Sequence, residues 1–366
     1  MAPASALAEE LFGREQVEKA RRYHWPGYVA WAANAAIGLA VLALLAAVGP
    51  AFTSWSWWLA TATITAIAIG ASAVARLPLG YAMGYRRERS WGFSTQTPRG
   101  WLADRAKAFT VELALTVPLM IGLVGLARAL PTWWPLVAAL GAVAFVLLVS
   151  FLAPVVIEPI FNRFAPLGDE DLAGELRALA DRAGVPVRDV LVADASRRTT
   201  KVNAYVSGVG KTRRVVLFDT LLEESSPAEV GLVVAHELGH RRGRHVLQGT
   251  ILAMMGIAIA VLVVWAVIGT PAPDDVPLLL LIGAALELLS LPAMTAVSRR
   301  WERFADRFSI ELTRDAQVFE DTFRTLATAN LADLDPPRAV YYALFSHPTI
   351  PERIAFGRRW TEGASG

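Results

Sequence analysis

The sequence predicts a mainly α-helical fold, in which a polytopic membrane bundle of about six spans carries a smaller α+β insert. Hydrophobic residues make up 54% of the 366-residue chain and charged residues 19%, whereas soluble proteins carry about 45–50% apolar and about 25% charged residues. The stretch from Val29 to Ala75 has no charged residue in 47 positions. Residues 158–245, by contrast, include 13 basic and 13 acidic residues, which is the charge density of a soluble domain.

The same composition excludes several classes of function. The chain has no cysteine, which rules out a disulfide scaffold, a cysteine-ligated zinc module, an iron–sulfur site and a cysteine nucleophile. A net charge of +2 over the whole chain is too small to attract nucleic acid. The composition therefore favours the lipid bilayer as a partner, and the sequence carries no signal for an oligomeric state.

The number of spans follows from the lengths of the apolar runs. A helix rises about 1.5 Å per residue, so about 20 apolar residues cross a bilayer. The uncharged 47-residue run is long enough for two crossings and must turn near residue 49. A set of buried soluble helices is the alternative, and this run argues against it. The expected spans are 28–48, 57–77, 109–127, 133–154, 246–269 and 276–298.

Basic residues beside the spans predict the orientation, because cytoplasmic loops are enriched in lysine and arginine. The opposite connections contain Arg128 as their only basic residue. We therefore expect a multi-pass cell-membrane protein with both termini, the 76–108 loop and the 158–245 insert in the cytoplasm. The basic residues cluster before the first span and between the second and third, at Lys19, Arg21, Arg22, Arg76, Arg86, Arg87, Arg89, Arg99, Arg105 and Lys107.

These boundaries divide the chain into four parts. The expected parts are an N-terminal membrane domain with four spans (1–157), a cytoplasmic insert (158–245), the fifth and sixth spans (246–298) and a cytoplasmic C-terminal part (299–366).

Periodicity predicts the elements of the insert. An amphipathic helix is expected over 169–184, a strand over 189–194 and a hairpin of strands over 202–207 and 214–218. Ser226 begins another helix, because Pro227 follows at the first helical position and Glu229 completes a capping box.

The helix that begins at Ser226 contains the sequence His236-Glu237-Leu-Gly-His240. Residues four apart share a helical face, so His236 and His240 can bind one Zn²⁺. Glu237 is rotated away from them and can reach a metal-bound water instead. Zinc lowers the pKa of that water to about 7, and a carboxylate beside it can accept the proton and pass it to a leaving amine. The alternative is an exposed polar helix face.

A third ligand is needed, and two candidates follow. His245 lies one residue short of the metzincin spacing, and we expect it to continue the same helix into the fifth span. Glu302 and Asp306 are four apart, so one can bind zinc while the other orients a ligand histidine; a helix start with surface salt bridges is the alternative. A short loop makes the fifth and sixth spans antiparallel neighbours, which brings His240 and Glu302 to one membrane surface.

Several further patterns accompany these residues. They are Asn203-Ala-Tyr205, Val215-Val-Leu-Phe-Asp-Thr220, Ser346-His347-Pro with Glu352-Arg353, and Trp91-Gly-Phe-Ser-Thr-Gln-Thr97. With the histidine motif and Glu302-x-x-x-Asp306, the chain resembles the type I CAAX prenyl endopeptidases, which are integral-membrane zinc metalloproteases. The HtpX heat-shock proteases are more distant relatives. The resemblance runs from about residue 76 to 354.

The resemblance implies a site of the gluzincin type. One zinc ion per chain would be held by His236, His240 and Glu302, with Glu237 as the base and Asp306 beside the site. It also implies that the strand with Asn203, Ala204 and Tyr205 holds an extended substrate, and that His347 and Arg353 stabilise the oxyanion. The strand can pair with a peptide backbone, and cationic donors can stabilise a tetrahedral oxyanion.

The chain departs from this family in its N-terminal region, where four spans are expected and the eukaryotic enzymes have five. Arginine far exceeds lysine and alanine is abundant, which indicates a bacterial source, and bacteria generally lack protein prenylation. The predicted function is a zinc metalloendopeptidase that cleaves peptides or membrane-associated proteins at the cytoplasmic face. The alternatives are a CAAX-type C-terminal processing peptidase and a non-catalytic membrane scaffold or transporter, against which the intact Glu237 argues.

Overall fold

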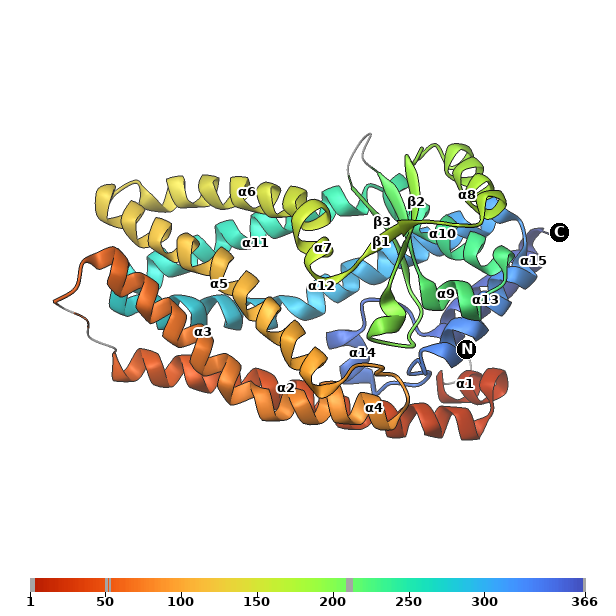
Figure 1. The fold of residues 1–366 in the computed structure, drawn as a ribbon, viewed down its shortest axis with the longest axis horizontal. Coiled ribbons are helices and arrows are strands. Elements are labelled where there is room, and N and C mark those ends of the chain that lie inside the picture. Colours follow the sequence, from red (N-terminus) through yellow and green to blue (C-terminus); the bar gives the residue numbers. More distant parts are fainter. Residues whose placement is uncertain (1–3, 50–51, 53, 209–212, 365–366) are drawn as a thin grey trace.

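The long apolar helices run along the long axis of the molecule (Figure 1). The computed structural model describes residues 4–49, 52, 54–208 and 213–364. Within them, six helices are long and apolar enough to cross a membrane, which confirms the six-span prediction. They are α2 (Arg14–Val48), α3 (Trp57–Tyr81), α5 (Pro98–Ala129), α6 (Trp134–Leu152), α11 (His245–Ile268) and α12 (Val276–Thr313).

Helices α2, α3, α5 and α12 extend beyond the predicted spans at the end that carries the sheet. Helix α3 continues through a π-helical turn, η1 (Ala82–Arg87), into α4 (Glu88–Ser90). Helix α5 begins at Pro98, where the Thr97 hydroxyl accepts a hydrogen bond from the Gly100 amide at 3.1 Å. The expected 76–108 loop is therefore mostly helical. Hydropathy marks only the part of a helix inside the bilayer, whereas the backbone ladder continues until a cap ends it.

A four-stranded sheet follows α6, which leads through η2 (Ala153–Ile157) and α7 (Glu158–Phe161) into the insert. Strands β3 (Ala204–Ser207) and β4 (Arg214–Phe218) are antiparallel, as predicted; the connecting residues 209–212 lie outside the described part of the chain. Strand β2 (Asp189–Ala193) is parallel to β4, and β1 (Phe164–Pro166), which was not predicted, is antiparallel to β2. The order β1-β2-β4-β3 leaves β3 at an edge.

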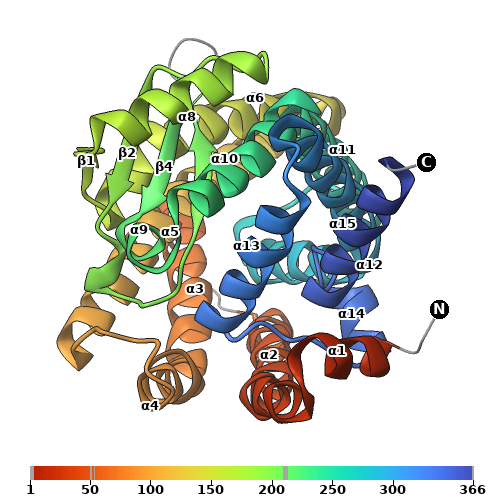
Figure 2. The same ribbon diagram turned by 90° about the vertical axis from the view of Figure 1, so that its right-hand side faces the viewer.

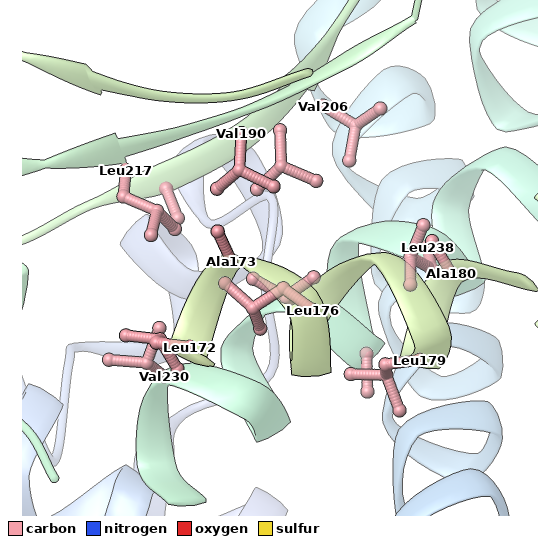
Figure 3. Close-up of a cluster of buried hydrophobic side chains, with 14 of the residues drawn as sticks. Leu172, Ala173, Leu176, Leu179, Ala180, Val190, Val206, Leu217, Val230 and Leu238 are labelled. Carbon is pink, nitrogen blue, oxygen red and sulfur yellow. The ribbon is translucent and has the colours of Figure 1, made fainter. Parts of the chain in front are cut away.

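The core of the insert lies between this sheet and two helices, α8 (Glu170–Arg182) and α10 (Pro227–Arg242). Figure 3 shows Leu176 of α8 among Val190 and Leu217 of the sheet, with Leu238 of α10 nearby. The predicted capping box at the start of α10 is present. The insert also contains the short helices η3 (Ala195–Arg197) and α9 (Asp219–Glu224), and η5 (Pro273–Asp275) lies in the connection between α11 and α12.

The C-terminal helices cover the opposite side of α10. Figure 2 shows α10 between the sheet and α13, with α15 beyond it. Helix α1, near the start of the chain, lies at this same end (Figure 1), where Leu11 packs with Phe319, Phe323 and Ile354. The bounds are α1 (Ala4–Phe12), α13 (Ala316–Ala329), α14 (Arg338–Leu344) and α15 (Ile350–Ala364).

Candidate active site

Helices α10 and α12 bring the three predicted metal ligands together. The His236 Nε2 and His240 Nε2 atoms are 3.2 Å apart. Glu302 places Oε2 3.3 Å from His236 Nε2 and Oε1 3.2 Å from His240 Nε2. The helices can approach this closely because residue 239 is glycine: a Cβ at Gly239 would lie 3.0 Å from the Ala305 Cα atom.

These donors fit a metal ion. Two imidazole nitrogens and a carboxylate oxygen form a ligand set that zinc takes in hydrolases, and the ligand atoms lie within 4.8 Å of one another. The Glu302 side chain is 5% exposed, and its buried Oε2 atom has no hydrogen-bond partner among the described residues. A buried carboxylate oxygen without a donor is costly, and a cation between the three residues would satisfy it.

His236 is held from behind by an ion pair. Its Nδ1 atom lies 3.0 Å from Asp306 Oδ1, and Arg353 donates from Nε to Asp306 Oδ2 at 2.9 Å. A proton on Nδ1 shared with Asp306 makes Nε2 the ligand atom when a metal binds. Burial lowers the pKa of His236, but the carboxylates of Asp306 and Glu302 outweigh burial and raise this pKa to about 9. A metal ion would therefore displace a proton when it binds.

Glu237 lies next to His236 at the wall of a cavity of about 240 Å³. Burial raises the pKa of the Glu237 carboxyl group, which brings it closer to the range that a general base needs. The polar lining of the cavity consists of Asn203, His236, Glu237, Thr322, Asn330, His347 and Arg353, and its apolar lining includes Leu221, Leu232, Val233, Phe323 and Leu326.

Of the three residues predicted to bind substrate, Asn203 and Ala204 line this cavity. The Asn203 Oδ1 atom accepts a hydrogen bond from the Ala204 amide at 2.9 Å. Tyr205 points elsewhere, because its hydroxyl donates to Glu158 Oε2 at 3.2 Å, and burial together with Glu158 raises the pKa of this hydroxyl. Ala204 and Tyr205 are successive residues of β3, and successive side chains of a strand point to opposite faces.

His347 and Arg353 both reach the site, but in different ways. The His347 side chain is 55% exposed, with Nε2 3.2 Å from Glu302 Oε1. Arg353 is buried and bonds to Asp306, and its guanidinium carbon lies 4.0 Å from the centre of the Phe323 ring. The resemblance assigns oxyanion stabilisation to both residues. In the structure His347 is exposed beside Glu302, whereas Arg353 is buried and paired with Asp306.

Sequence reasoning did not find two residues that hold the edge strand. Asn330 accepts from the Val202 amide at 2.9 Å and donates to the Val202 carbonyl at 3.1 Å, which ties down the residue before Asn203. Arg241 donates to the Val206 carbonyl. No spacing signal points to Asn330, since it lies 128 positions from Val202.

The expectation that His245 continues the helix of His240 is wrong. Helix α10 ends at Arg242, Arg244 takes a left-handed conformation with φ 56°, and α11 begins at His245. This turn places His245 Nδ1 3.0 Å from His240 Nδ1. Arg244 itself does not signal a break, because arginine rarely adopts a positive φ.

Comparison with known proteins covers nearly the whole chain. Residues 166–361 match peptidase family M48, and residues 3–163 match the CAAX prenyl protease N-terminal family, described as having five membrane helices. Within that range, the described residues form four long apolar helices, α2, α3, α5 and α6.

Among curated relatives, the uncharacterized metalloprotease YhfN of Bacillus subtilis is 33% identical, over 76% of this chain and 68% of that protein. CAAX prenyl protease 1 of Saccharomyces cerevisiae is 34% identical, over 50% of this chain and 41% of that protein. The crystal structure of S. mikatae Ste24p has the same fold, with a TM-score of 0.79 over 93% of this chain and 88% of that chain at 24% identity. The chain therefore belongs to peptidase family M48 and is a multi-pass, membrane-embedded metalloprotease.

Proposed function

We propose that this chain is a zinc endopeptidase that cleaves peptides or membrane-associated proteins at the cytoplasmic face of the membrane. The observation that supports it most strongly is the cluster of His236, His240 and Glu302 beside Glu237, at the wall of a cavity that an edge strand borders. Helices α1 and α15 lie at the same end of the molecule as this site (Figure 1). That arrangement agrees with the cytoplasmic placement that the basic residues predict.

His236, His240 and Glu302 would hold one Zn²⁺ per chain, which when bound lowers the pKa of water and polarises a carbonyl group. Glu237 accepts a proton from the attacking water and delivers it to the leaving amine. Its carboxylate suits this task because burial raises its pKa. Asp306 keeps the Nδ1 proton of His236 in place, and Arg353 keeps Asp306 charged and oriented.

The edge strand β3 offers a defined register for an extended substrate. Phe218 donates to the Asn203 carbonyl at 3.0 Å, so by the antiparallel alternation the backbone groups of Ala204 and Val206 point away from β4. The Ala204 amide donates to Asn203 Oδ1, and the Val206 carbonyl accepts from Arg241. Within the described residues, the Ala204 carbonyl and the Val206 amide remain for a substrate backbone.

The cavity supports a substrate with an apolar side chain beside the cleaved bond. Leu232, Phe323 and Leu326 line the same cavity as Glu237 and Asn203, and burying an apolar side chain there is favourable. His347 is exposed next to Glu302, where an imidazole N–H can donate to the oxyanion.

C-terminal processing of a CAAX substrate is the second candidate, favoured by the relatives named CAAX prenyl protease 1. A non-catalytic scaffold or transporter is disfavoured by the presence of Glu237 beside the candidate ligands. The two enzyme candidates differ in substrate: the second requires a farnesylated C-terminal CAAX peptide, whereas the first cleaves unmodified apolar peptides.

The experiment uses full-length protein purified in detergent, with zinc measured by elemental analysis and both peptide classes as substrates. We expect about one zinc per chain. Glu237→Ala should lower the cleavage rate by at least about 100-fold, because a general base contributes about 10²–10⁴-fold, and should retain the metal. Glu224→Ala, at an exposed position, is the matched control and should keep full activity. Equal rates for Glu237→Ala and wild type would overturn the mechanism.

A further inference from the structure

We propose that His245 is a positioning residue of the metal site, whose ring accepts a hydrogen bond from His240 and so aims this ligand at the metal. The proposal rests on the proposed zinc site. His245 lies at the first position of α11. It is not one of the three candidate ligands, and no motif described above assigns it a role.

The geometry assigns the two nitrogens of His240 to different tasks. Its Nε2 atom lies 3.2 Å from both His236 Nε2 and Glu302 Oε1, so Nε2 is the ligand atom. Its Nδ1 atom lies 3.0 Å from His245 Nδ1. An imidazole that binds a metal through Nε2 keeps its proton on Nδ1, so His240 donates and His245 accepts. His245 then carries its own proton on Nε2.

The two ligand histidines are thus held by different chemistry. His236 is held by the charged pair of Asp306 and Arg353, whereas His240 is held by a neutral ring. A partner behind a ligand histidine fixes its tautomer and ring orientation. In the described part of the chain, the contact with His245 is the one hydrogen bond that the Nδ1 atom of His240 makes.

The surrounding residues hold the His245 ring rigidly. The residue is 6% exposed, and its ring stacks on Trp301 with centroids 5.3 Å apart and an interplanar angle of 12°. The edge of Phe304 closes another side at 5.3 Å. Trp301 is itself fixed, because its Nε1 atom donates to Gln248 Oε1 at 2.8 Å.

The backbone between the two helices makes room for this ring. The left-handed turn at Arg244 folds His245 back beneath α10. A Cβ atom at Gly243 would lie 2.3 Å from His245 Nε2, so any side chain at position 243 would displace the ring. The sequence Gly243-Arg244-His245 therefore builds a support for His240 at the junction with the membrane helix.

The test separates hydrogen bonding from packing with two substitutions. His245→Phe keeps a ring that can stack on Trp301 but removes the acceptor, whereas His245→Asn keeps an acceptor atom near the Nδ1 position but loses the ring. Zinc dissociation constants are measured by chelator competition on the full-length protein in detergent, and thermal melting of the metal-free protein reports folding. His24→Phe is the matched control, because His24 bonds to the Leu331 carbonyl and to none of the candidate ligands.

We expect His245→Phe to weaken zinc binding by about 10–100-fold, with metal-free melting close to wild type. His245→Asn should restore most of the affinity, and His24→Phe should leave it unchanged. If His245→Phe binds zinc like wild type while His245→Asn is weaker, His245 acts through packing and the proposal is wrong. If wild-type protein binds no zinc, the proposed metal site fails first, and the two failures are distinct.

Discussion

In α6, Leu140 is 63% exposed, whereas in α10 Leu238 is fully buried. In the most apolar 18-residue segments of α6 and α11, only 6% of the residues are buried. The membrane region therefore turns its leucines outward, where lipid replaces water. The insert turns its leucines inward against the sheet and α8 (Figure 3). The same residue type thus marks the surface in one region and the core in the other, because the surrounding solvent differs.

Helix α12 contains both situations within one element. Leu289, in its membrane portion, is 76% exposed. Farther along, Arg299, Glu302 and Asp306 are all buried, although charged residues are seldom buried unless paired. Along this one helix, an apolar side chain is exposed in the membrane portion, whereas charged side chains are buried farther along. Buried polar groups, rather than hydropathy, therefore identify the site.

The largest expected effect concerns the buried ion pair. Arg353→Leu leaves the buried Asp306 without its guanidinium partner, and we expect a loss of about 3–5 kcal/mol in the free energy of unfolding. The control is Arg307→Leu, which breaks an exposed pair with Glu311 and should cost at most about 1 kcal/mol. Thermal or chemical unfolding of metal-free protein in detergent measures both. Similar losses in the two variants would contradict the contrast between buried and exposed charges.

A second prediction compares leucines in the two regions. Leu238→Ala removes a fully buried side chain of the insert and should cost about 2–5 kcal/mol through lost burial and a cavity. Leu262→Ala, in α11, removes a side chain that is 54% exposed and faces lipid whether or not the bundle is assembled, so its cost should be below about 1 kcal/mol. The same unfolding assay decides, and a larger cost for Leu262→Ala would show that α11 has a packed partner on this face.

The smallest effect depends on pH. Hydrogen bonds from Arg358 and Arg324 lower the pKa of Glu320 from 4.5 to about 2. Because the folded pKa lies below the ordinary one, the stabilisation is complete above pH 4.5 and is lost as the pH falls toward 2. Glu320→Gln should therefore lower the melting temperature slightly at pH 7, with a difference from wild type that shrinks across this interval. Glu311→Gln, in an exposed pair, should show little difference at either pH, and a constant Glu320→Gln deficit would refute the assignment.

Local patterns were enough to predict much of the molecule. The six spans follow from run length, the start of α10 from Ser226 and Glu229, and the shared face of His236 and His240 from helical spacing. Each depends on interactions within a few residues or on the bilayer thickness. The meeting of Glu302 with these histidines needed one further rule, that consecutive spans joined by a short loop are neighbours.

Other features depend on the path of the chain through space. No local pattern connects the residues that meet in three contacts. They are the parallel pairing of β2 with β4, the hydrogen bonds of Asn330 to Val202 and the hydrogen bond of Tyr205 to Glu158. His245 was visible in the sequence, but its contact with His240 requires a left-handed arginine. Periodicity encodes which face of an element is apolar or polar. Which partner covers that face depends on packing among distant segments, and this packing brings the support residues to the metal ligands.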